Sequence, residues 1–338
     1  MEGQGLMWDK GSKREILLEV ADLRTQFATK KGQVVAVDGI GFSLRKGEVL
    51  GIAGESGCGK SVTSLSILRL LPDYASVSSG TILLGGKDLL GLTEEEMCDV
   101  RGNEIAMIFQ DPMTSLNPVF TLATQMMEPF MIHQDLDKTQ ARAKALEMLK
   151  KVGIPSPELR LDEYPHQLSG GMRQRVMIAM ALSCNPRLLI ADEPTTALDV
   201  TTQAQILDLM RDLRDDLGTA IMLITHDLGV VAEMADSVLV MYAGKAVEYS
   251  PAYDLFLNPR HPYTQGLLES IPRLEEEADA LRTIPGTVPN QYERIQGCKF
   301  RARCPYAMAV CAEKDPPAFL VGKAQVFCFK YAEGGSDA

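Results

Sequence analysis

The sequence contains no apolar stretch as long as the roughly 18 residues that a membrane-spanning helix requires. Apolar runs such as Ile221 to Ile224 and Val238 to Tyr242 have the length of β-strands. The first residues, MEGQGLMWDKGSKRE, also lack the apolar core of a signal peptide. We therefore expect a soluble, cytoplasmic protein that reaches a membrane only through a partner.

Positive charge is also in deficit, since 34 Lys and Arg residues stand against 45 Asp and Glu residues, a net charge of −11. Nucleic acids select basic surfaces, so we expect no nucleic-acid partner. A nucleotide is not excluded, because its phosphates need only a small local site. The 46% of hydrophobic and 23% of charged residues rule out a disordered or fibrous chain, and 338 residues suggest about two domains.

From Ile16 onward, short β-rich runs alternate with helical patterns, which is typical of an α/β protein with a largely parallel sheet. Strands are expected over 49–53, 105–109, 188–191 and 220–225, with a hairpin over 237–249. Helices are expected over 60–71, 119–132, 138–152, 171–183 and 200–216. The buried face of the last helix is expected to contain Ile206, Leu209, Met210 and Leu213.

A glycine-rich segment between an expected strand and an expected helix reads GESGCGKS and fits the phosphate-loop pattern G-x-x-x-x-G-K-[ST]. Glycines let the backbone wrap closely, so that N–H groups and the helix N-terminus point at phosphate oxygens, and Lys60 supplies positive charge. The Ser61 hydroxyl is expected to bind Mg²⁺. The predicted ATP-binding residues are Gly54, Glu55, Ser56, Gly57, Cys58, Gly59, Lys60, Ser61 and Val62.

An apolar strand, Leu188 to Ala191, runs into two carboxylates. We expect Asp192 to hold Mg²⁺, directly or through water, and Glu193 to orient or deprotonate the attacking water. About 130 residues separate this strand from the phosphate loop, more than a simple phosphate-loop unit needs. A further segment is therefore inserted between the two motifs.

The inserted segment carries Gln110 after a strand and, further on, Ser169, Gly170 and Gly171 at the start of a helix. Exposed amides, a hydroxyl and the positive end of the helix dipole form a second anion cradle there. One ATP cannot easily use two cradles of one chain, so this cradle is expected to face ATP held by another subunit. A plain helix N-cap with turn glycines would look the same in the sequence.

Taken together and in this order, the motifs resemble those of ATP-binding cassette (ABC) ATPases. The matching segments are Gly54–Ser61, Gln110, Leu168–Met172, Leu188–Glu193, Ala197–Asp199 and His226. The resemblance covers residues 16–258 and implies a P-loop NTPase fold. That fold has a RecA-like parallel sheet core, an antiparallel β subdomain and an α-helical signature subdomain inserted over about 110–185.

The resemblance also implies roles for single residues. Gln110 would contact Mg²⁺ and water and sense the membrane partner, Asp199 would communicate across a dimer, and His226 would contact the γ-phosphate. Phe27 lies where the family has an aromatic ring stacked on adenine, although a core strand residue would look the same. Met172 replaces the Gln that most members have after the signature glycines, as is common in the peptide-importer branch.

After residue 258 the sequence no longer alternates between strand and helix patterns. Four of the seven cysteines lie in this last part: Cys298, Cys304, Cys311 and Cys328. Disulfides are disfavoured in a reducing cytosol, so clustered thiols suggest a metal site. Their spacing lacks the C-x₂-C pairs of ordinary zinc modules, and thiolates suit either zinc or an iron–sulfur cluster. Four free thiols are the remaining alternative.

The text His261-Pro-Tyr-Thr, followed by GCKFRARCPYAMAVC, resembles the C-terminal extension of oligopeptide and dipeptide importer ATPases. The resemblance implies that residues 259–338 form a small Cys-rich extension with a [4Fe–4S] cluster on the four cysteines. We expect His261 itself to be a structural loop residue.

The combined resemblance implies the ATP-hydrolysing subunit of an ABC importer that takes up di- or oligopeptides through a membrane permease. Its expected partners are a second, similar but non-identical ATPase in a heterodimer, two integral membrane permease subunits and, indirectly, a solute-binding protein. Its expected location is the cytoplasmic face of a prokaryotic cell membrane. The alternatives are a soluble ABC ATPase without a permease, an importer of nickel or metal chelates, an exporter, and a non-hydrolytic sensor of nucleotide.

Overall fold

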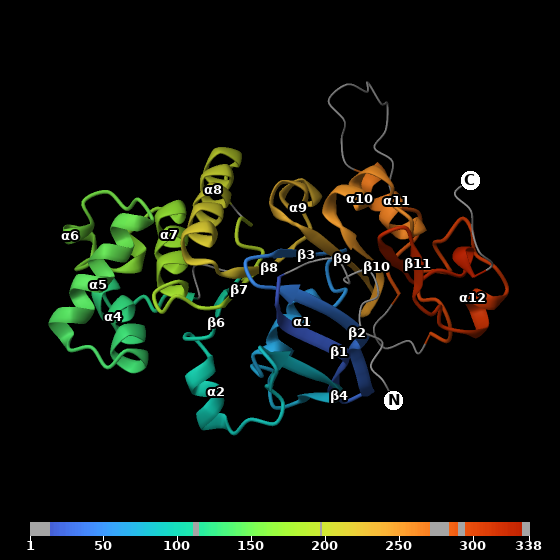
Figure 1. Cartoon of the computed structure of the whole chain (residues 1–338), viewed down its shortest axis with the longest axis horizontal. Coiled ribbons are helices and arrows are strands. Elements are labelled where there is room, and N and C mark those ends of the chain that lie inside the picture. Colours follow the sequence, from blue (N-terminus) through green and yellow to red (C-terminus); the bar gives the residue numbers. More distant parts are fainter. Residues whose placement is uncertain (1–13, 111–114, 197, 271–283, 290–294, 333–338) are drawn as a thin grey trace. The chain divides into compact units, whose positions relative to one another are not determined.

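The computed structural model describes residues 14–110, 115–196, 198–270, 284–289 and 295–332, and the chain divides into two compact units (Figure 1). Unit 1 contains the chain up to Leu44, Leu50–Leu90 and the chain from Thr225 onward, and unit 2 contains Arg45–Val49 and Gly91–Ile224. Among the helices of the described residues, none combines the length and the apolarity needed to cross a membrane.

A four-stranded sheet in unit 1 is built from the N-terminal part of the chain, in the order β2-β1-β4-β5. The strands are β1 (Ile16–Thr29), β2 (Gly32–Arg45), β4 (Ala75–Leu84) and β5 (Lys87–Asp88). β4 runs antiparallel to both β1 and β5. Alternate residues at the start of β1 are buried, which is the pattern of a strand with one face on a core.

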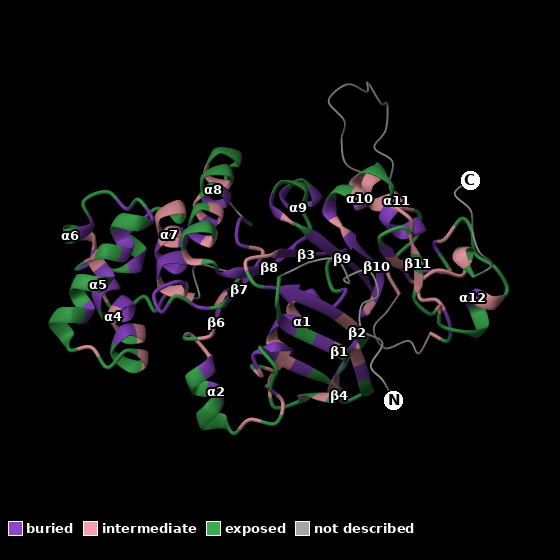
Figure 2. Ribbon diagram, viewed as in Figure 1, coloured by how far each residue is buried: buried purple, intermediate pink, exposed green. Residues whose placement is uncertain are grey.

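The second sheet of unit 1 places β3 (Val49–Ala53) parallel to β9 (Ser237–Tyr242), which forms a hairpin with β10 (Lys245–Pro251). β12 (Ala324–Val326) pairs with β10, and β11 (Phe319–Val321) pairs with β12. The C-terminal strands β11 and β12 therefore extend the sheet that contains β3, β9 and β10. Figure 2 shows β3 and β9 buried along their length, as expected for strands covered on both faces.

The helices of unit 1 are α1 (Lys60–Ile67), α9 (Leu228–Met234), α10 (Ala252–Leu257), α11 (Pro262–Glu269) and α12 (Val310–Glu313), with a 3₁₀ turn over Phe329–Tyr331. α1 ends four residues before the predicted end at residue 71. Leu68 caps it, and the next residue, Arg69, has a left-handed φ of 52°, which a continuing helix cannot accommodate.

Unit 2 contains three parallel strands in the order β8-β7-β6, namely β8 (Ala220–Thr225), β7 (Leu188–Asp192) and β6 (Ile105–Ile108). β7 and β8 are buried throughout, which explains why their sequences are nearly continuous runs of apolar residues. The strands confirm the predicted positions to within one residue at either end.

The helices of unit 2 are α2 (Glu94–Val100), α4 (Leu122–His133), α5 (Lys138–Lys151), α6 (Pro157–Arg160), α7 (Gly170–Ala181) and α8 (Val200–Leu217), with a 3₁₀ turn over Pro165–Gln167. α4 starts at residue 122 and not at 119, because Thr121 is its N-cap. Asp137 and Gln140 form a capping box that starts α5. On α8 the buried face contains Leu207 in place of the predicted Leu209.

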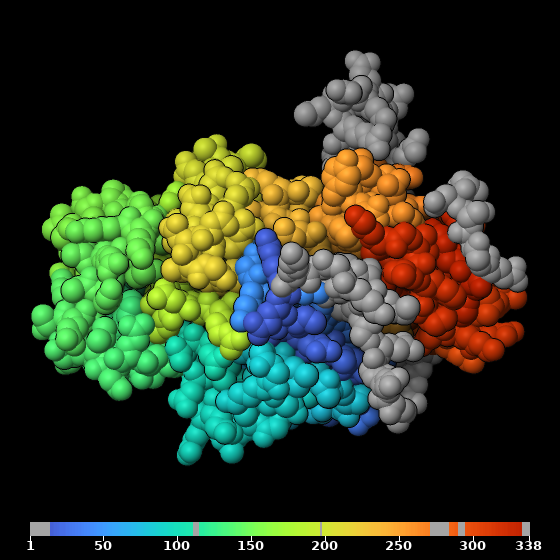
Figure 3. Space-filling view, in the orientation of Figure 1, coloured from blue at the N-terminus to red at the C-terminus, as the bar shows by residue number. Residues whose placement is uncertain are grey.

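The core of unit 1 includes a cluster of aromatic residues drawn from three distant parts of the chain. Tyr242 ends β9, Tyr263 lies in α11 and Phe300 lies near the C-terminus, and their ring centroids are 4.7–5.4 Å apart. Tyr242 meets each of the other two rings edge-to-face, a favoured geometry for ring pairs. The segment around Phe300 is thus a packed part of unit 1. In Figure 3 the red atoms of the C-terminal part adjoin the orange atoms of α10 and α11.

Replacing Phe300 by alanine should lower the free energy of unfolding by about 3–5 kcal/mol, because the side chain is 2% exposed and its removal leaves a cavity. Urea denaturation followed by circular dichroism measures the change. Tyr306→Ala is the matched control, since this ring of the same segment is 53% exposed and its loss should cost under about 1 kcal/mol. Equal losses in the two variants would contradict the packing of this segment on the core.

Candidate nucleotide site

The phosphate loop of unit 1 connects β3 to α1 and follows a strand whose five residues are all buried. Two of its glycines cannot be replaced without a collision. A Cβ atom at Gly54 would lie 2.2 Å from the Met241 carbonyl oxygen, and one at Gly59 would lie 2.6 Å from the Ala36 carbonyl oxygen. Both residues also have positive φ, 151° and 105°. The neighbouring backbone therefore requires glycine at both positions.

Lys60 is the first residue of α1, and its ammonium group lies inside the loop. Its Nζ donates to the Gly54 carbonyl at 2.7 Å and to the Glu55 carbonyl at 3.2 Å, and the residue is only 5% exposed. Ser61 and Val62 follow in the first turn of α1, where backbone N–H groups have no partner within the helix. A glycine cradle, a lysine and a helix N-terminus are the donor set that a triphosphate requires.

Glu55 contacts residues that the sequence motifs did not single out. Its backbone N–H donates to the Tyr263 hydroxyl at 2.9 Å, and its carboxylate accepts from both terminal nitrogens of Arg303. The residues lie 208 and 248 positions further along the chain, so no local spacing could have predicted the contacts. His261, expected in a loop, is the N-cap of α11, where burial lowers its pKa to about 3 and its neutral Nδ1 accepts from the Tyr263 N–H.

In unit 2, the two carboxylates at the end of β7 differ in their surroundings. Asp192 is 4% exposed, whereas Glu193 is half-buried and leaves the strand with a left-handed φ of 49°. Gln110 and Thr196 both donate to Oε2 of Glu193, at 2.9 and 3.0 Å. The structure thus brings together Gln110 and Glu193 and adds Thr196, which the motifs did not indicate. Within unit 2, Asp192 and Gln110 carry oxygen atoms of the kind that Mg²⁺ prefers as ligands.

The signature segment of unit 2 starts α7. Ser169 is the N-cap, and its hydroxyl accepts from the Met172 N–H at 3.3 Å, while Gly170 and Gly171 form the first turn. Ser169 and Gly170 are exposed, so this helix N-terminus is accessible to a ligand or to another molecule. Gln174, one turn further on, donates to the Pro194 carbonyl and fastens α7 to the loop that follows Glu193.

The remaining predicted residues lie at the ends of strands and helices. Asp199 is the exposed N-cap of α8, and hydrogen bonds from the Thr202 side chain and backbone lower its pKa. His226 follows β8 and is exposed. Phe27, on β1, is half-buried, and its ring centroid lies 6.0 Å from that of Tyr74. Ala197 lies outside the described residues.

The prediction of a [4Fe–4S] cluster on the C-terminal cysteines is wrong. The described residues, which include Cys298, Cys304, Cys311 and Cys328, contain no group of three or more His, Cys, Asp or Glu that could hold a metal ion. The zinc alternative is unsupported for the same reason. Burial raises the pKa of the Cys298 thiol to about 11 and also raises the pKa values of Cys304 and Cys328. Cys298 and Cys304 instead pack against the apolar cluster of unit 1.

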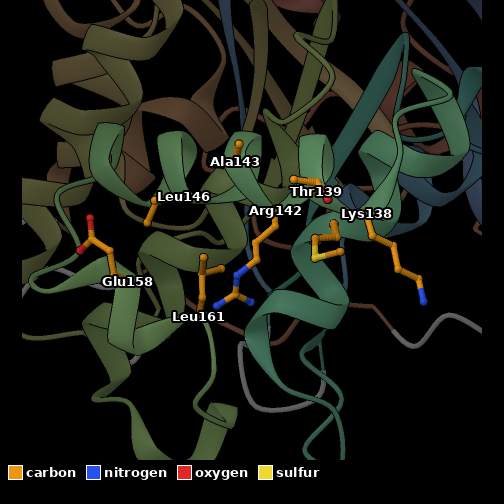
Figure 4. Close-up of a pocket in the computed structure, with 8 residues that line it drawn as sticks. Lys138, Thr139, Arg142, Ala143, Leu146, Glu158 and Leu161 are labelled. Atoms are coloured by element: carbon orange, nitrogen blue, oxygen red, sulfur yellow. The ribbon is translucent and has the colours of Figure 1, made fainter.

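A hollow of about 560 Å³ lies on the helical part of unit 2 and is shown in Figure 4. Apolar and charged side chains line it together, from the middle of α4, from α5 and from α6 with its C-cap residue. The lining residues are Met127, Lys138, Thr139, Arg142, Ala143, Leu146, Glu158 and Leu161.

Comparisons with known proteins agree with this geometry. A family model described as "ABC transporter" matches residues 37–196, and one described as "Oligopeptide/dipeptide transporter, C-terminal region" matches residues 247–311. The chain is 56% identical to the probable peptide ABC transporter ATP-binding protein y4tR of Sinorhizobium fredii, over 90% of this chain and 91% of that protein. It is 53% identical to the oligopeptide transport ATP-binding protein AppD of Bacillus subtilis, over 95% and 98%.

Among solved structures, the dimeric ATP-binding cassette MJ0796 bound to ADP and Pi is similar, with a TM-score of 0.63 and 26% identity. The match covers 70% of this chain and 99% of that one.

Replacing Gly54 by alanine should weaken ATP binding by at least about tenfold, because the new Cβ would collide with the Met241 carbonyl and a positive φ would be forced on alanine. Isothermal titration calorimetry measures the dissociation constant. Gly86→Ala is the matched control, since Gly86 also has a positive φ but its Cβ would meet open space. If both variants bound ATP equally well, the close approach at Gly54 would not matter for the loop.

Proposed function

Because the chain belongs to the ATP-binding subunits of ABC transporters, we propose that it hydrolyses ATP to drive the import of di- or oligopeptides. One observation carries the choice of cargo. Relatives that are more than half identical over nine-tenths of the chain bear the names of peptide transport proteins, and the C-terminal match is to the same class. These names favour peptides over metal chelates and favour a permease-coupled role over a free-standing ATPase.

In the proposed reaction, the loop from Gly54 to Ser61 binds the phosphates of ATP through backbone N–H groups, and Lys60 neutralises part of their charge. Ser61, Gln110 and Asp192 would hold Mg²⁺, which supplies further positive charge to the β- and γ-phosphates. His226 would contact the γ-phosphate, and Phe27 would stack on the adenine. These residues act by binding and orientation, so no covalent intermediate is required.

Glu193 is the residue proposed to orient or deprotonate the attacking water. Its orientation is set from two sides: the left-handed backbone turns it out of β7, and Gln110 and Thr196 hold one carboxylate oxygen. A group that acts on water needs such a fixed direction, because general-base catalysis depends on hydrogen-bond geometry. The contact also supports a role for Gln110 in reporting the state of the site.

We further propose that the cradle of Ser169, Gly170 and Gly171 binds ATP held by a second, non-identical ATPase, and that Asp199 communicates across this dimer. The exposed N-terminus of α7 supports the proposal. ATP would stabilise the closed dimer more than the open one, so hydrolysis would shift the population towards the open state.

The proposed membrane partners are two permease subunits at the cytoplasmic face of the cell membrane, supplied by a solute-binding protein. The helical insert over 110–185 would transmit the motion of the dimer to the permease. The hollow beside α5 (Figure 4) is lined by apolar Leu146 and Leu161 and by charged Arg142 and Glu158, a mixture suited to a protein segment.

Glu193→Gln should lower kcat by at least about 100-fold, the contribution of a general base, while leaving ATP binding intact. Phosphate release and calorimetric titration with ATP measure the two effects separately. Lys60→Ala is the control that should lose both binding and turnover. Undiminished turnover in the Glu193 variant would remove this residue from the chemistry, and near-normal hydrolysis without Lys60 would refute the loop assignment.

Deleting the gene should abolish uptake of a labelled tripeptide by whole cells, and a plasmid with the natural sequence, but not with Glu193→Gln, should restore it. Uptake of labelled nickel, measured in the same cells, should stay unchanged. Normal peptide uptake combined with lost nickel uptake would assign the protein to the import of metal chelates instead.

A further inference from the structure

We propose that Arg303 is a positioning residue that neutralises Glu55 and thereby allows the phosphate loop to bind ATP. The inference rests on the proposed ATP-binding function of this loop. It assigns to the C-terminal part of the chain a direct influence on nucleotide affinity.

Glu55 poses an electrostatic problem for the loop. Within Gly54–Ser61 it is the single acidic residue and Lys60 the single basic one, so the loop has no net charge of its own. A triphosphate carries several negative charges, and a bare carboxylate in the same loop would repel it. A loop that binds phosphate therefore needs an additional positive group close to Glu55.

Arg303 supplies that positive group through a bidentate pair with the Glu55 carboxylate. Its Nη1 donates to Oε2 of Glu55 at 2.7 Å and its Nη2 donates to Oε1 at 3.1 Å. Both oxygens of the carboxylate are thus engaged by one guanidinium, the strongest arrangement for such a pair. The hydrogen bonds to Glu55 raise the pKa of Arg303 above its ordinary value, so the positive charge is permanent.

Several other contacts hold Arg303 in place, so that it does not move with Glu55. Its Nε donates to the Pro285 carbonyl at 3.0 Å, its Nη2 lies 3.3 Å from the Ile284 carbonyl, and its guanidinium lies 5.7 Å from the Tyr242 ring centroid. The side chain is 5% exposed, against 28% for Glu55. A buried and fully bonded guanidinium is a fixed point to which the more exposed loop residue is tied.

Tyr263 fixes the same loop residue through its backbone. Its hydroxyl accepts from the Glu55 N–H at 2.9 Å, and burial raises the pKa of this phenol, so it stays uncharged. The Glu55 carbonyl in turn accepts from Nζ of Lys60 at 3.2 Å. Glu55 is therefore held at its amide, its carbonyl and its carboxylate, and it connects the C-terminal residues to the lysine that binds phosphate.

The test is a double-mutant cycle in the full-length chain, with ATP affinity measured by calorimetry. Arg303→Met should weaken ATP binding by roughly tenfold, the low end of the effect of losing a charged hydrogen-bonded partner. Glu55→Gln forms the second background, and its own ATP affinity is the reference for the double variant. In the Glu55→Gln background, Arg303→Met should change the affinity by less than about twofold, because the charge to be neutralised is gone.

The matched control is Arg301→Met, which removes a guanidinium from the same segment, where it donates to the Gln296 carbonyl. This variant should bind ATP normally. The melting temperature of each variant separates stability from affinity, because a merely structural role of Arg303 would lower stability in both backgrounds without changing the affinity of the folded protein. If Arg303→Met does not fold, Arg303→Lys replaces it, with a smaller loss that Glu55→Gln should also remove.

Unchanged ATP affinity without Arg303, or an equal loss with and without the Glu55 carboxylate, would overturn the inference. These results differ from those expected if the proposed function itself were wrong. If the loop did not bind ATP, the natural chain would show no ATP binding, or the Lys60→Ala variant would bind ATP normally.

Discussion

Binding a highly charged phosphate chain through backbone amides requires a tightly folded loop with a fixed conformation. Much of unit 1 surrounds the loop that meets this requirement. The loop passes so close to the carbonyl groups of Ala36 and Met241 that Gly54 and Gly59 have no room for a side chain. β3, buried on both faces, fixes the start of the loop, and α1 fixes its end. The two charged residues of the loop, Glu55 and Lys60, are both held by hydrogen bonds.

Within unit 1, Glu55 connects the loop to the C-terminal part of the chain. Tyr242, Tyr263 and Phe300 form one aromatic cluster, which also supports the residues that touch Glu55. β12 pairs with β10 and so continues the sheet of β9 and β10. The C-terminal segment is therefore attached to unit 1 both through this sheet and through the aromatic cluster. The proposed phosphate loop and the C-terminal residues are therefore joined by direct contacts.

In unit 2, the chemistry follows from parallel strands. The apolar residues of such strands are buried, and polar residues stand at their carboxyl ends, as Asp192 and Glu193 do at the end of β7. Hydrogen bonds from Gln110 and Thr196 then give Glu193 one orientation. The resemblance to ABC ATPases implied that Gln110 and Glu193 belong to one site. The contact of the Thr196 hydroxyl with Glu193, three residues earlier, is known only from the structure.

The sequence by itself determined the α/β class, the strands, the phosphate loop and the family, because these depend on local patterns: runs of apolar residues, glycines at set intervals and a lysine beside them. It misplaced the end of α1, where the left-handed Arg69 stops the helix, and it predicted Leu209 where α8 buries Leu207. It also suggested a metal cluster, because spacing along the chain shows that thiols are near in sequence, not that their sulfur atoms converge. Only the tertiary structure decided that Cys298 and Cys304 pack as apolar side chains and that Arg303 reaches Glu55 across 248 positions, since such contacts arise from folding of the whole unit.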